Sequence, residues 1–531
     1  MCIENATIGD LQQALAAGGT TAAALVNAYL ARIEAYDRGG PRLGAVREVN
    51  PDATAIAAAI DRNKPAQRRP LEGIPILLKD NVATADAQHT TAGSLALADT
   101  RAKRDATVTE RLRGAGAVIL GKANLTEFAN IVAIDMPAGY SSLGGQVKNP
   151  FAPELDDKGV PIVPPGGSSS GSAVAVAAGL AAAAIGTETS GSLLSPASQN
   201  GVVTVKPTIG LVSRAGIIPI AHSQDTAGPL TRTVRDAAVV LNVLAAADPL
   251  DLATAALRRP ADYTSGLDKD GLKGARIGVP SDPSDPGNDV YYGPLPPRAA
   301  AVMREAIAVL EAQGATIVRA NISTEGWIGG PGTEIAILNR NPESPTKNQP
   351  ARRPIVFVYE LKHDLNAYLR DWATGTAMHS LADIVAFNLA NADRALRFGQ
   401  DIFLAAEATR GDLSELEYVS ARQMDLRAAR ELGLDAYMDR HRLDAVLFPG
   451  AAGAAIAAKA GYPSVQVPAG FVAGVRDRDT PDYPYGATFT GRAWSEPTLL
   501  RLAYAFEQTT QRRRPPPNLP PLDPGCASQP G

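Results

Sequence analysis

The chain has 531 residues, of which 45% are hydrophobic and 20% charged, a balance typical of a globular protein that can bury a large core. Its 51 basic and 55 acidic residues give a net charge of −4, and aromatic residues make up only 5%. Neither a basic nor a base-stacking surface for nucleic acid is therefore expected. No apolar run reaches the roughly 18 residues that a membrane-spanning helix needs, so a membrane partner is not expected either.

Two cysteines, Cys2 and Cys526, lie at opposite ends of the chain, in segments that we expect to be mobile. This number and placement argue against a disulfide framework and against a cysteine-based zinc site. The first residues, MCIENATIGDL, lack the basic and apolar regions of a signal peptide, which predicts a cytoplasmic protein. A secreted or periplasmic protein whose signal peptide had been removed would give the same pattern.

Hydrophobic periodicity predicts that buried strands and helices alternate along the chain. Two helices are expected within residues 7–38, the second capped by Thr20 or Thr21. Strands are expected at 71–81, 116–121, 275–280, 316–320, 444–449 and 461–470. Further helices are expected at 108–114 (with Thr107 as cap), 233–246, 298–313, within 358–440 and at 496–511. This alternation favours an α/β protein with a mixed sheet and helices on both faces.

The composition changes in three places without dividing the chain into separate domains. Residues 248–297 are rich in Pro, Asp and Gly and are interpreted as a connecting region, and residues 339–354 as a surface loop. Residues 512–531 are rich in Pro and Gly and are expected to be a disordered tail. We therefore predict one domain over residues 1–511, with its main motifs within 71–240.

Lys79 ends the apolar run GIPILL at residues 73–78. Burial disfavours the charged form of a lysine, and a neutral lysine can act as a general base. The alternative is a lysine at a strand end that reaches solvent beside Asp80. Taken alone, this second interpretation is the more common one.

The loop GGSSSGS at residues 166–172 precedes an Ala-rich helix. Ser168–Ser170 can be interpreted as helix caps, or Ser168 as a hydroxyl that relays protons. The same loop matches the G-x-S-x-G pattern with Ser169 at its centre. That pattern requires a buried strand directly before it, which the sequence does not provide, so Ser169 is a poor nucleophile candidate.

The loop GTETSGS at residues 186–192 follows an apolar segment, at a position where a strand could end. The backbone N–H groups of Thr189, Ser190, Gly191 and Ser192 could point at one oxyanion, with the Ser192 hydroxyl facing the same point. The alternative is a Ser/Thr-rich surface turn. Ser192 lies 24 residues after Ser168.

Histidine is given no catalytic role. The five histidines show neither a triad pattern with Ser and Asp nor a metal-binding spacing. They are His89, His222, His363, His379 and His441. A phosphate-binding loop is absent as well, so no cofactor or metal is expected.

Several segments together resemble the amidase signature family, and within it the bacterial peptide amidases. They are GIPILLKDN, GGSSSGSAVAVAAGL, GTETSGSLLSPA and VKPTIGLVSRAGIIPIAHSQDTAGPLTRTVRDAA. The resemblance extends as far as residues 494–508. It implies one compact α/β domain around a mixed sheet of about eleven strands. It also implies hydrolysis of amide bonds through an acyl-enzyme, without a cofactor.

The resemblance further implies a Ser-Ser-Lys triad. In it, Lys79 is the base, Ser168 a bridging serine that follows a cis peptide bond, and Ser192 the nucleophile. The backbone amides of residues 189–192 form the oxyanion hole. The implied partner is a small-molecule amide, and the implied assembly a monomer or homodimer.

The substrate remains open among amides (small, aryl or peptide C-terminal), anilides, carbamates (urethanes) and esters. A glutamine-dependent amidotransferase A-type subunit is another alternative, but it usually has arginine where this chain has Leu194. A non-catalytic binding protein is a third, disfavoured because all three triad positions are retained. Ser190 stands where many members have Gly and peptide amidases Asp. Residues 450–460 form a shorter connection than the one that helps wall the pocket in peptide amidases, which predicts a more open substrate site, and residues 134–140 could fill that wall; substrate choice is expected to depend on these two segments.

Overall fold

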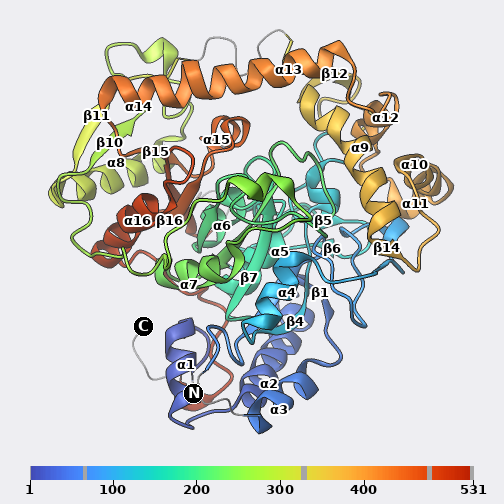
Figure 1. Cartoon of the computed structure of the whole chain (residues 1–531), viewed down its shortest axis with the longest axis vertical. Coiled ribbons are helices and arrows are strands. Elements are labelled where there is room, and N and C mark those ends of the chain that lie inside the picture. The colour runs from blue at the N-terminus through green and yellow to red at the C-terminus, as the bar shows by residue number, and fades with distance from the viewer. Residues whose placement is uncertain (1, 64–67, 324–331, 475–480, 527–531) are drawn as a thin grey trace.

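One mixed sheet of 11 strands forms the centre of this computed structural model, which describes residues 2–63, 68–323, 332–474 and 481–526 (Figure 1). The strand order is β1-β4-β2-β7-β9-β8-β16-β17-β15-β10-β11, which confirms the expected size and mixed character of the sheet. The strands are β1 (Val46–Val49), β2 (Pro75–Lys79), β4 (Val118–Ala123), β7 (Ala183–Glu188), β8 (Val203–Lys206), β9 (Thr226–Thr231), β10 (Arg276–Val279), β11 (Thr316–Arg319), β15 (Ala445–Pro449), β16 (Ser464–Val472) and β17 (Tyr483–Thr490).

The direction of the strands decides which chain segments meet at one edge of the sheet. β2 runs parallel to both β4 and β7. All residues of these three strands are buried, which explains why they appear in the sequence as continuous apolar runs. Because the carboxyl ends of parallel strands lie at the same edge, Lys79 at the end of β2 comes close to the residues that end β7.

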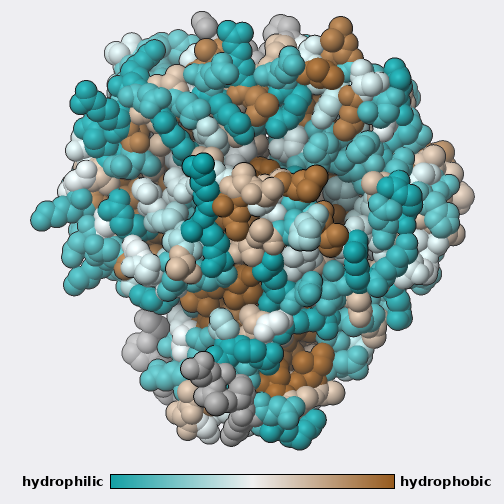
Figure 2. All heavy atoms as spheres, in the orientation of Figure 1, coloured by the Kyte–Doolittle hydropathy of each residue, from teal (hydrophilic) through white to brown (hydrophobic). Residues whose placement is uncertain are grey.

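Helices cover both faces of this sheet. They are α1 (Ile8–Ala16), α2 (Ala22–Arg32), α3 (Ala53–Arg62), α4 (Thr107–Gly114), α5 (Ser170–Ala177), α6 (Leu194–Asn200), α7 (Val234–Leu244), α8 (Pro297–Ala312), α9 (Ile355–Asp371), α10 (Leu381–Ala390), α11 (Ala392–Ala395), α12 (Asp401–Glu407), α13 (Leu416–Leu426), α14 (Asp435–His441), α15 (Ala454–Ala460) and α16 (Glu496–Thr510). Thr21 caps α2 by accepting a hydrogen bond from Ala24 N, as expected. Every residue of α5 is buried, and Figure 2 shows a largely hydrophilic outer face.

The helices from α9 to α14 confirm the helical pattern expected within residues 358–440, and they lie along the top and right of Figure 1. The expected surface loop at 339–354 is partly wrong. Its last residues form β13 (Pro350–Pro354), which pairs antiparallel with β12 (Glu334–Leu338). The prolines stand at the two ends of β13, in a sheet of only two strands, where a missing backbone N–H is tolerated. Two further short pairs join β3 (Arg101–Ala102) to β14 (Ala373–Thr374) and β5 (Tyr140–Ser141) to β6 (Gly145–Gln146).

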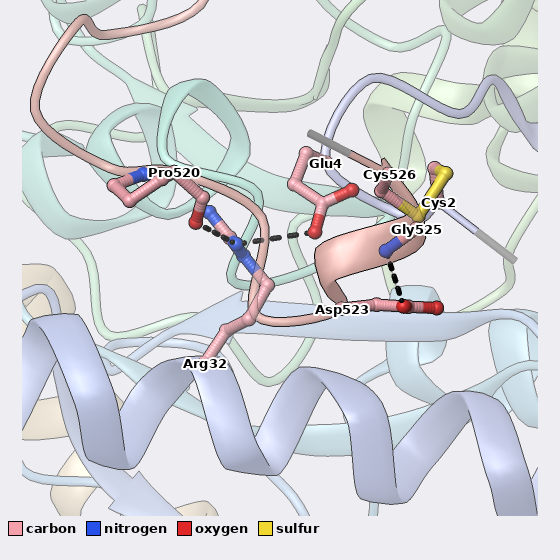
Figure 3. Close-up of a disulfide and its surroundings, with 7 residues drawn as sticks. All are labelled: Cys2, Glu4, Arg32, Pro520, Asp523, Gly525 and Cys526. Atoms are coloured by element: carbon pink, nitrogen blue, oxygen red, sulfur yellow. Dashed lines mark hydrogen bonds and ion pairs between the residues drawn. A yellow bond between two sulfur atoms is a disulfide. The ribbon is translucent and has the colours of Figure 1, made fainter. Parts of the chain in front are cut away.

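A disulfide bond joins Cys2 to Cys526, with 5.4 Å between their Cα atoms (Figure 3). This corrects the expectation that two cysteines at opposite ends would lie in mobile segments and form no disulfide framework. The sequence separation of 524 residues says nothing about distance in the fold, which brings Cys2 and Cys526 together, as Figure 3 shows.

Arg32, at the end of α2, holds the chain near both cysteines. Its buried guanidinium donates hydrogen bonds to Glu4 Oε1 (3.3 Å), Pro520 O (3.0 Å) and Gly179 O (3.0 Å). Figure 3 shows this side chain pointing from α2 toward Glu4 and Pro520. The Pro-rich tail predicted to be disordered thus has defined partners as far as Cys526. Residues 527–531 of that tail lie outside the described residues.

Removal of the disulfide is expected to destabilise the protein. A cross-link restricts the unfolded chain, so the double substitution of Cys2→Ser and Cys526→Ser should lower the free energy of unfolding by about 2–5 kcal/mol. Denaturant unfolding with and without a thiol reductant measures this. The reductant should shift the midpoint of the wild type and leave that of the variant unchanged. Equal midpoints for the oxidised wild type and the variant would contradict the prediction.

In the part of the chain that the structure describes, no helix combines the length and apolar character needed to cross a membrane.

Candidate active site

Lys79 is the last residue of β2, and its side chain is fully buried. Its Nζ lies 2.8 Å from Ser168 Oγ and donates hydrogen bonds to Thr187 Oγ1 (2.8 Å) and Thr187 O (3.3 Å). Burial lowers the pKa of Lys79 to about 7, although the carboxylates of Asp225 and Glu188 act in the opposite direction. The alternative in which Lys79 reaches solvent is therefore wrong, and a large neutral fraction is present near pH 7.

The carboxylate next to Lys79 in the chain is engaged elsewhere. Asp80 forms an ion pair with Arg47, with 2.6 Å between Asp80 Oδ2 and Arg47 Nε. It also accepts hydrogen bonds from the backbone N–H groups of Thr91 and Gly93. With its neighbour paired in this way, Lys79 keeps hydroxyl and carbonyl oxygens as its hydrogen-bond partners.

Ser168 is buried in the loop that leads into α5, and its peptide bond with Gly167 is cis. The loop passes very close to other backbone segments. A Cβ atom on Gly166 would lie 2.6 Å from the Cα of Pro196 in α6, and Gly166 has a φ of +68°. Only glycine tolerates both conditions, which explains the first glycine of the pair before the serines. Ser168 O accepts a hydrogen bond from Thr126 N (3.0 Å), which holds the other side of the loop.

Ser169 has a different task from Ser168. Its hydroxyl donates to Thr187 O (3.0 Å) and accepts from Thr187 N (3.2 Å), so both of its bonds hold the end of β7. Ser169 occupies the N-cap position of α5 but makes no side-chain cap hydrogen bond. The helix-cap interpretation of these serines is therefore wrong for Ser169, and its hydroxyl is already bonded to the Thr187 backbone.

The loop 186–192 begins inside β7, and this strand ends at Glu188, which agrees with the prediction that a strand ends in this loop. Glu188 Oε2 accepts hydrogen bonds from Leu193 N (2.7 Å) and Leu194 N (3.1 Å), and Gly191 has a left-handed φ of +86°. These bonds fold the chain back at Ser192. Ser192 O accepts a hydrogen bond from Ser169 N (3.1 Å), so the two serine loops are directly joined.

The loop from residue 189 to residue 192 is also held from the far side. Thr189 Oγ1 donates to Asp225 Oδ1, and the other oxygen of Asp225 accepts from the backbone N–H groups of Ile220 and Ala221 (both 2.9 Å). Burial raises the pKa of Asp225 to about 6. Ser192 is buried, with 8% of the residue exposed, and the adjacent Ser190 is half-buried.

A cavity of about 280 Å³ opens beside Thr187 and Thr189. Its walls come from residues 214–226 and from one face of α9. The apolar lining includes Ile217, Ile218, Ile220, Tyr368 and Trp372, and the charged or ionisable lining includes Arg214, His222, Asp225, Asp251 and Asp364. Neither expected wall lines this cavity among the described residues: 134–140 does not, and in 450–460 Ala454 lies against Gly191 instead.

Comparison with known proteins places this geometry in a family. The family model named Amidase matches residues 24–326. The crystal structure of peptide amidase from Stenotrophomonas maltophilia is 43% identical, with a TM-score of 0.82 over 96% of this chain and 98% of that one. A probable amidase of Arabidopsis thaliana is 38% identical over 97% of this chain and 92% of its own length. An amidase family protein of Bacillus anthracis is 34% identical, with a TM-score of 0.83 over 97% and 92% of the two chains.

The chain belongs to the amidase signature family. It is an enzyme that hydrolyses amide bonds, and its fold is the single large mixed sheet of that family.

In this amidase the predicted site residues lie together at one edge of the sheet. Lys79 contacts Ser168, and the backbones of Ser169 and Ser192 join the two loops. Sequence reasoning missed Thr187, Glu188 and Asp225, each of which holds a predicted residue in place. Thr187 and Glu188 belong to the loop 186–192 that the sequence already indicated, so their position in that loop could have pointed to them. Asp225 stood inside the longest segment that carries the family resemblance, but nothing in that segment indicated a contact with Thr189.

Loss of the Glu188 carboxylate is expected to slow this amidase. Glu188→Ala removes the acceptor for two backbone N–H groups next to Ser192, and displacement of a reacting group by about 1 Å can cost roughly 10²-fold in rate. The kcat for a primary amide measures the effect. Glu188→Gln keeps one acceptor oxygen and should lose less. A wild-type rate in a folded Glu188→Ala variant would contradict this role.

Proposed function

We propose that this amidase hydrolyses small, aryl or peptide C-terminal amides through a Ser-Ser-Lys triad of Lys79, Ser168 and Ser192. The observation that carries the proposal is the 2.8 Å contact between Lys79 Nζ and Ser168 Oγ in a fully buried setting. A lysine whose pKa is about 7 holds a large neutral fraction near that pH, as a general base must.

In the proposed mechanism the proton moves along one path in both directions. Neutral Lys79 takes the proton of Ser168 while Ser168 takes that of Ser192, and Ser192 Oγ attacks the carbonyl carbon of the amide. The proton then returns through Ser168 to the departing amine as the C–N bond breaks. Water hydrolyses the remaining acyl-enzyme by the same route, which releases the carboxylic acid and regenerates Ser192.

The negative charge of the tetrahedral intermediate is assigned to the backbone amides of Thr189, Ser190, Gly191 and Ser192. Loss of one such donor typically costs about 3–4 kcal/mol of transition-state stabilisation. Two contacts support this role for the loop: the Glu188 carboxylate fixes the chain after Ser192, and Asp225 fixes the Thr189 side chain. Both keep the loop in shape before substrate arrives, so little reorganisation is needed during the reaction.

The cavity favours a substrate with an apolar or aromatic group beside the amide. Ile217, Ile218 and Trp372 provide the apolar surface. Arg214 is paired with Asp251 through a bidentate ion pair, so this guanidinium is not free to bind a substrate carboxylate. Anilides, carbamates and esters of similar shape remain the alternative substrates for the same triad.

A release assay across primary peptide amides, anilides, carbamates and esters tests the proposed substrate class. Amides with an apolar neighbouring group should be turned over fastest, and Ser192→Ala is the control. Release of ammonia from a simple amide by the purified chain alone would count against the amidotransferase subunit, which needs partner proteins. Labelling of Ser192 by a fluorophosphonate would exclude the non-catalytic binding protein.

The disulfide between Cys2 and Cys526 supports a secreted or periplasmic location over the cytoplasmic one that the first residues suggested, because disulfides persist in oxidising compartments. Maleimide labelling of freshly lysed cells tests this, since cytoplasmic protein would carry two free thiols.

The central sheet takes strands from β1 at residues 46–49 to β17 at residues 483–490, which supports one domain over residues 1–511. The prediction of a monomer or homodimer is tested by sedimentation analysis.

A further inference from the structure

A cluster of two histidines and two carboxylates lies at the edge of the cavity beside Thr187 and Thr189. Glu360, His363 and Asp364 lie within one turn of α9, at the spacing that places side chains on neighbouring positions of a helix surface. His222 reaches the same turn from the loop before β9. In the described ranges, His222, His363 and Asp364 are the one group of three such residues whose ligand atoms lie within 4.8 Å of one another.

The short distances within this cluster run from the histidines to the carboxylates, whereas the two imidazole rings lie 6.2 Å apart between their centroids. His222 Nδ1 lies 2.9 Å from Asp364 Oδ2, and His363 Nδ1 lies 2.8 Å from Asp364 Oδ1. The fully buried Glu360 brings its Oε2 to 3.4 Å from His222 Nδ1. A tetrahedral zinc ion with bonds of 2.0–2.2 Å needs donor atoms about 3.3 Å apart. Small rotations of the two imidazoles would open the cluster to that size.

We propose that His222, His363 and Asp364 bind a divalent transition-metal ion of the zinc type, with Glu360 or water as the fourth ligand. Two imidazole nitrogens with carboxylate oxygens are a donor set for zinc-like ions, whereas calcium and magnesium take oxygen ligands. The two histidine side chains are each 46% exposed, which leaves an open side for the ion to enter and for a water ligand.

The ion takes the place of the two imidazole protons that otherwise point at Asp364. A histidine that ligates through Nδ1 carries no proton on that nitrogen, so a neutral imidazole places its proton on Nε2, and only an imidazolium releases a proton to solvent. The positive charge then lies between two carboxylates in place of two N–H donors. These residues show no metal-binding spacing in the sequence because His222 stands 141 residues before His363.

The site lies outside the proposed triad but shares a wall with its cavity. His222 and Asp364 line the cavity, while His363 does not. A bound ion therefore fastens the loop 214–226 to α9 across that wall. The same loop carries Asp225, whose carboxylate holds Thr189. The ion takes no part in the bond-breaking step.

Zinc titration of the full-length enzyme tests the proposal. The protein is first treated with a chelator and dialysed, and then titrated with Zn²⁺ in a calorimeter. We expect one ion per chain, and His363→Ala should weaken binding at least tenfold. His379→Ala is the matched control, because His379 is an exposed histidine near the start of α10 and outside the cluster. The zinc affinity of His379→Ala should equal that of the wild type.

Two further measurements separate loss of ligands from loss of fold. His363→Ala should keep the amidase activity of metal-free wild type, which shows that the variant is folded. Co²⁺ should give a visible absorption spectrum of low coordination number in the wild type and not in His222→Ala. Zinc affinity in His363→Ala within twofold of the wild type would overturn the proposal. Equal losses in His363→Ala and His379→Ala, or a wild type that binds no ion, would overturn it as well.

Discussion

Ser192→Ala is expected to abolish turnover of every amide substrate of this enzyme. The substitution removes the nucleophilic oxygen and leaves the backbone N–H of residue 192 in place, so binding and the oxyanion contacts should survive. Loss of a catalytic serine that acts through an acyl-enzyme costs roughly 10⁶-fold in kcat. Steady-state release of ammonia or amine measures the loss, and binding of a competitive inhibitor shows that the site remains formed.

Ser169→Ala is the matched control for that experiment. Ser169 is a buried serine of the neighbouring loop whose hydroxyl holds the Thr187 backbone, so its loss should lower the rate far less. Fluorophosphonate labelling gives an independent readout. It should persist in Ser169→Ala and disappear in Ser192→Ala. The opposite pattern would make Ser169 the nucleophile and remove the proposed role of Ser192.

Lys79→Ala is expected to lose both rate and pH dependence. In the wild type, kcat/KM should rise with pH through about 7, because protonated Lys79 cannot accept the proton of Ser168 and the neutral form can. General-base catalysis typically contributes 10²–10⁴-fold, which sets the expected loss. The variant should be slow, and its profile should lack this rising limb. Measurement of kcat/KM between pH 5 and 9 follows both changes.

Lys122→Met provides the control for a buried lysine. Lys122 lies on the neighbouring β4, is fully buried, and bonds Val82 O and Thr90 Oγ1 outside the two serine loops. Burial lowers its pKa to about 8, so it resembles Lys79 in environment. The Lys122→Met variant should keep the rise of kcat/KM with pH even if it is less stable. An unchanged pH profile in Lys79→Ala would remove Lys79 from the role of base.

Local sequence patterns singled out candidate residues at the ends of buried strands, and the family resemblance supplied their roles in a triad. Lys79 could be found because it ends a continuous apolar run, and such runs mark strands covered on both faces. Ser168 and Ser192 could be found because glycines surround them. The same patterns do not tell which residues of neighbouring strands lie beside each other. The Thr187 hydroxyl beside Lys79 was therefore missed, since this contact joins residues 108 positions apart.

Contacts between distant segments account for the remaining differences. Tyr368 of α9 and Trp372, which directly follows that helix, line the cavity, yet the pattern of the helix indicates only burial against the core. His222 and Asp364 carry no spacing signal, because one is on a loop and the other on α9. Cys2 and Cys526 show the same limit in its strongest form. Two residues at opposite ends of a chain come together only through the whole fold between them.

The position of β8 within the sheet has a consequence for synthesis of the enzyme. β8 (Val203–Lys206) is paired on one side with β9 and on the other with β16 (Ser464–Val472), which is made more than 250 residues later. While the ribosome makes the intervening chain, β8 lies at an unpaired edge of the sheet, and residues that are buried in the finished fold are exposed there. Unpaired strand edges promote aggregation. All three proposed catalytic residues precede β8. We therefore expect nascent chains that stop before residue 464 to associate with chaperones or with each other, and activity to arise only after the last strands have been released.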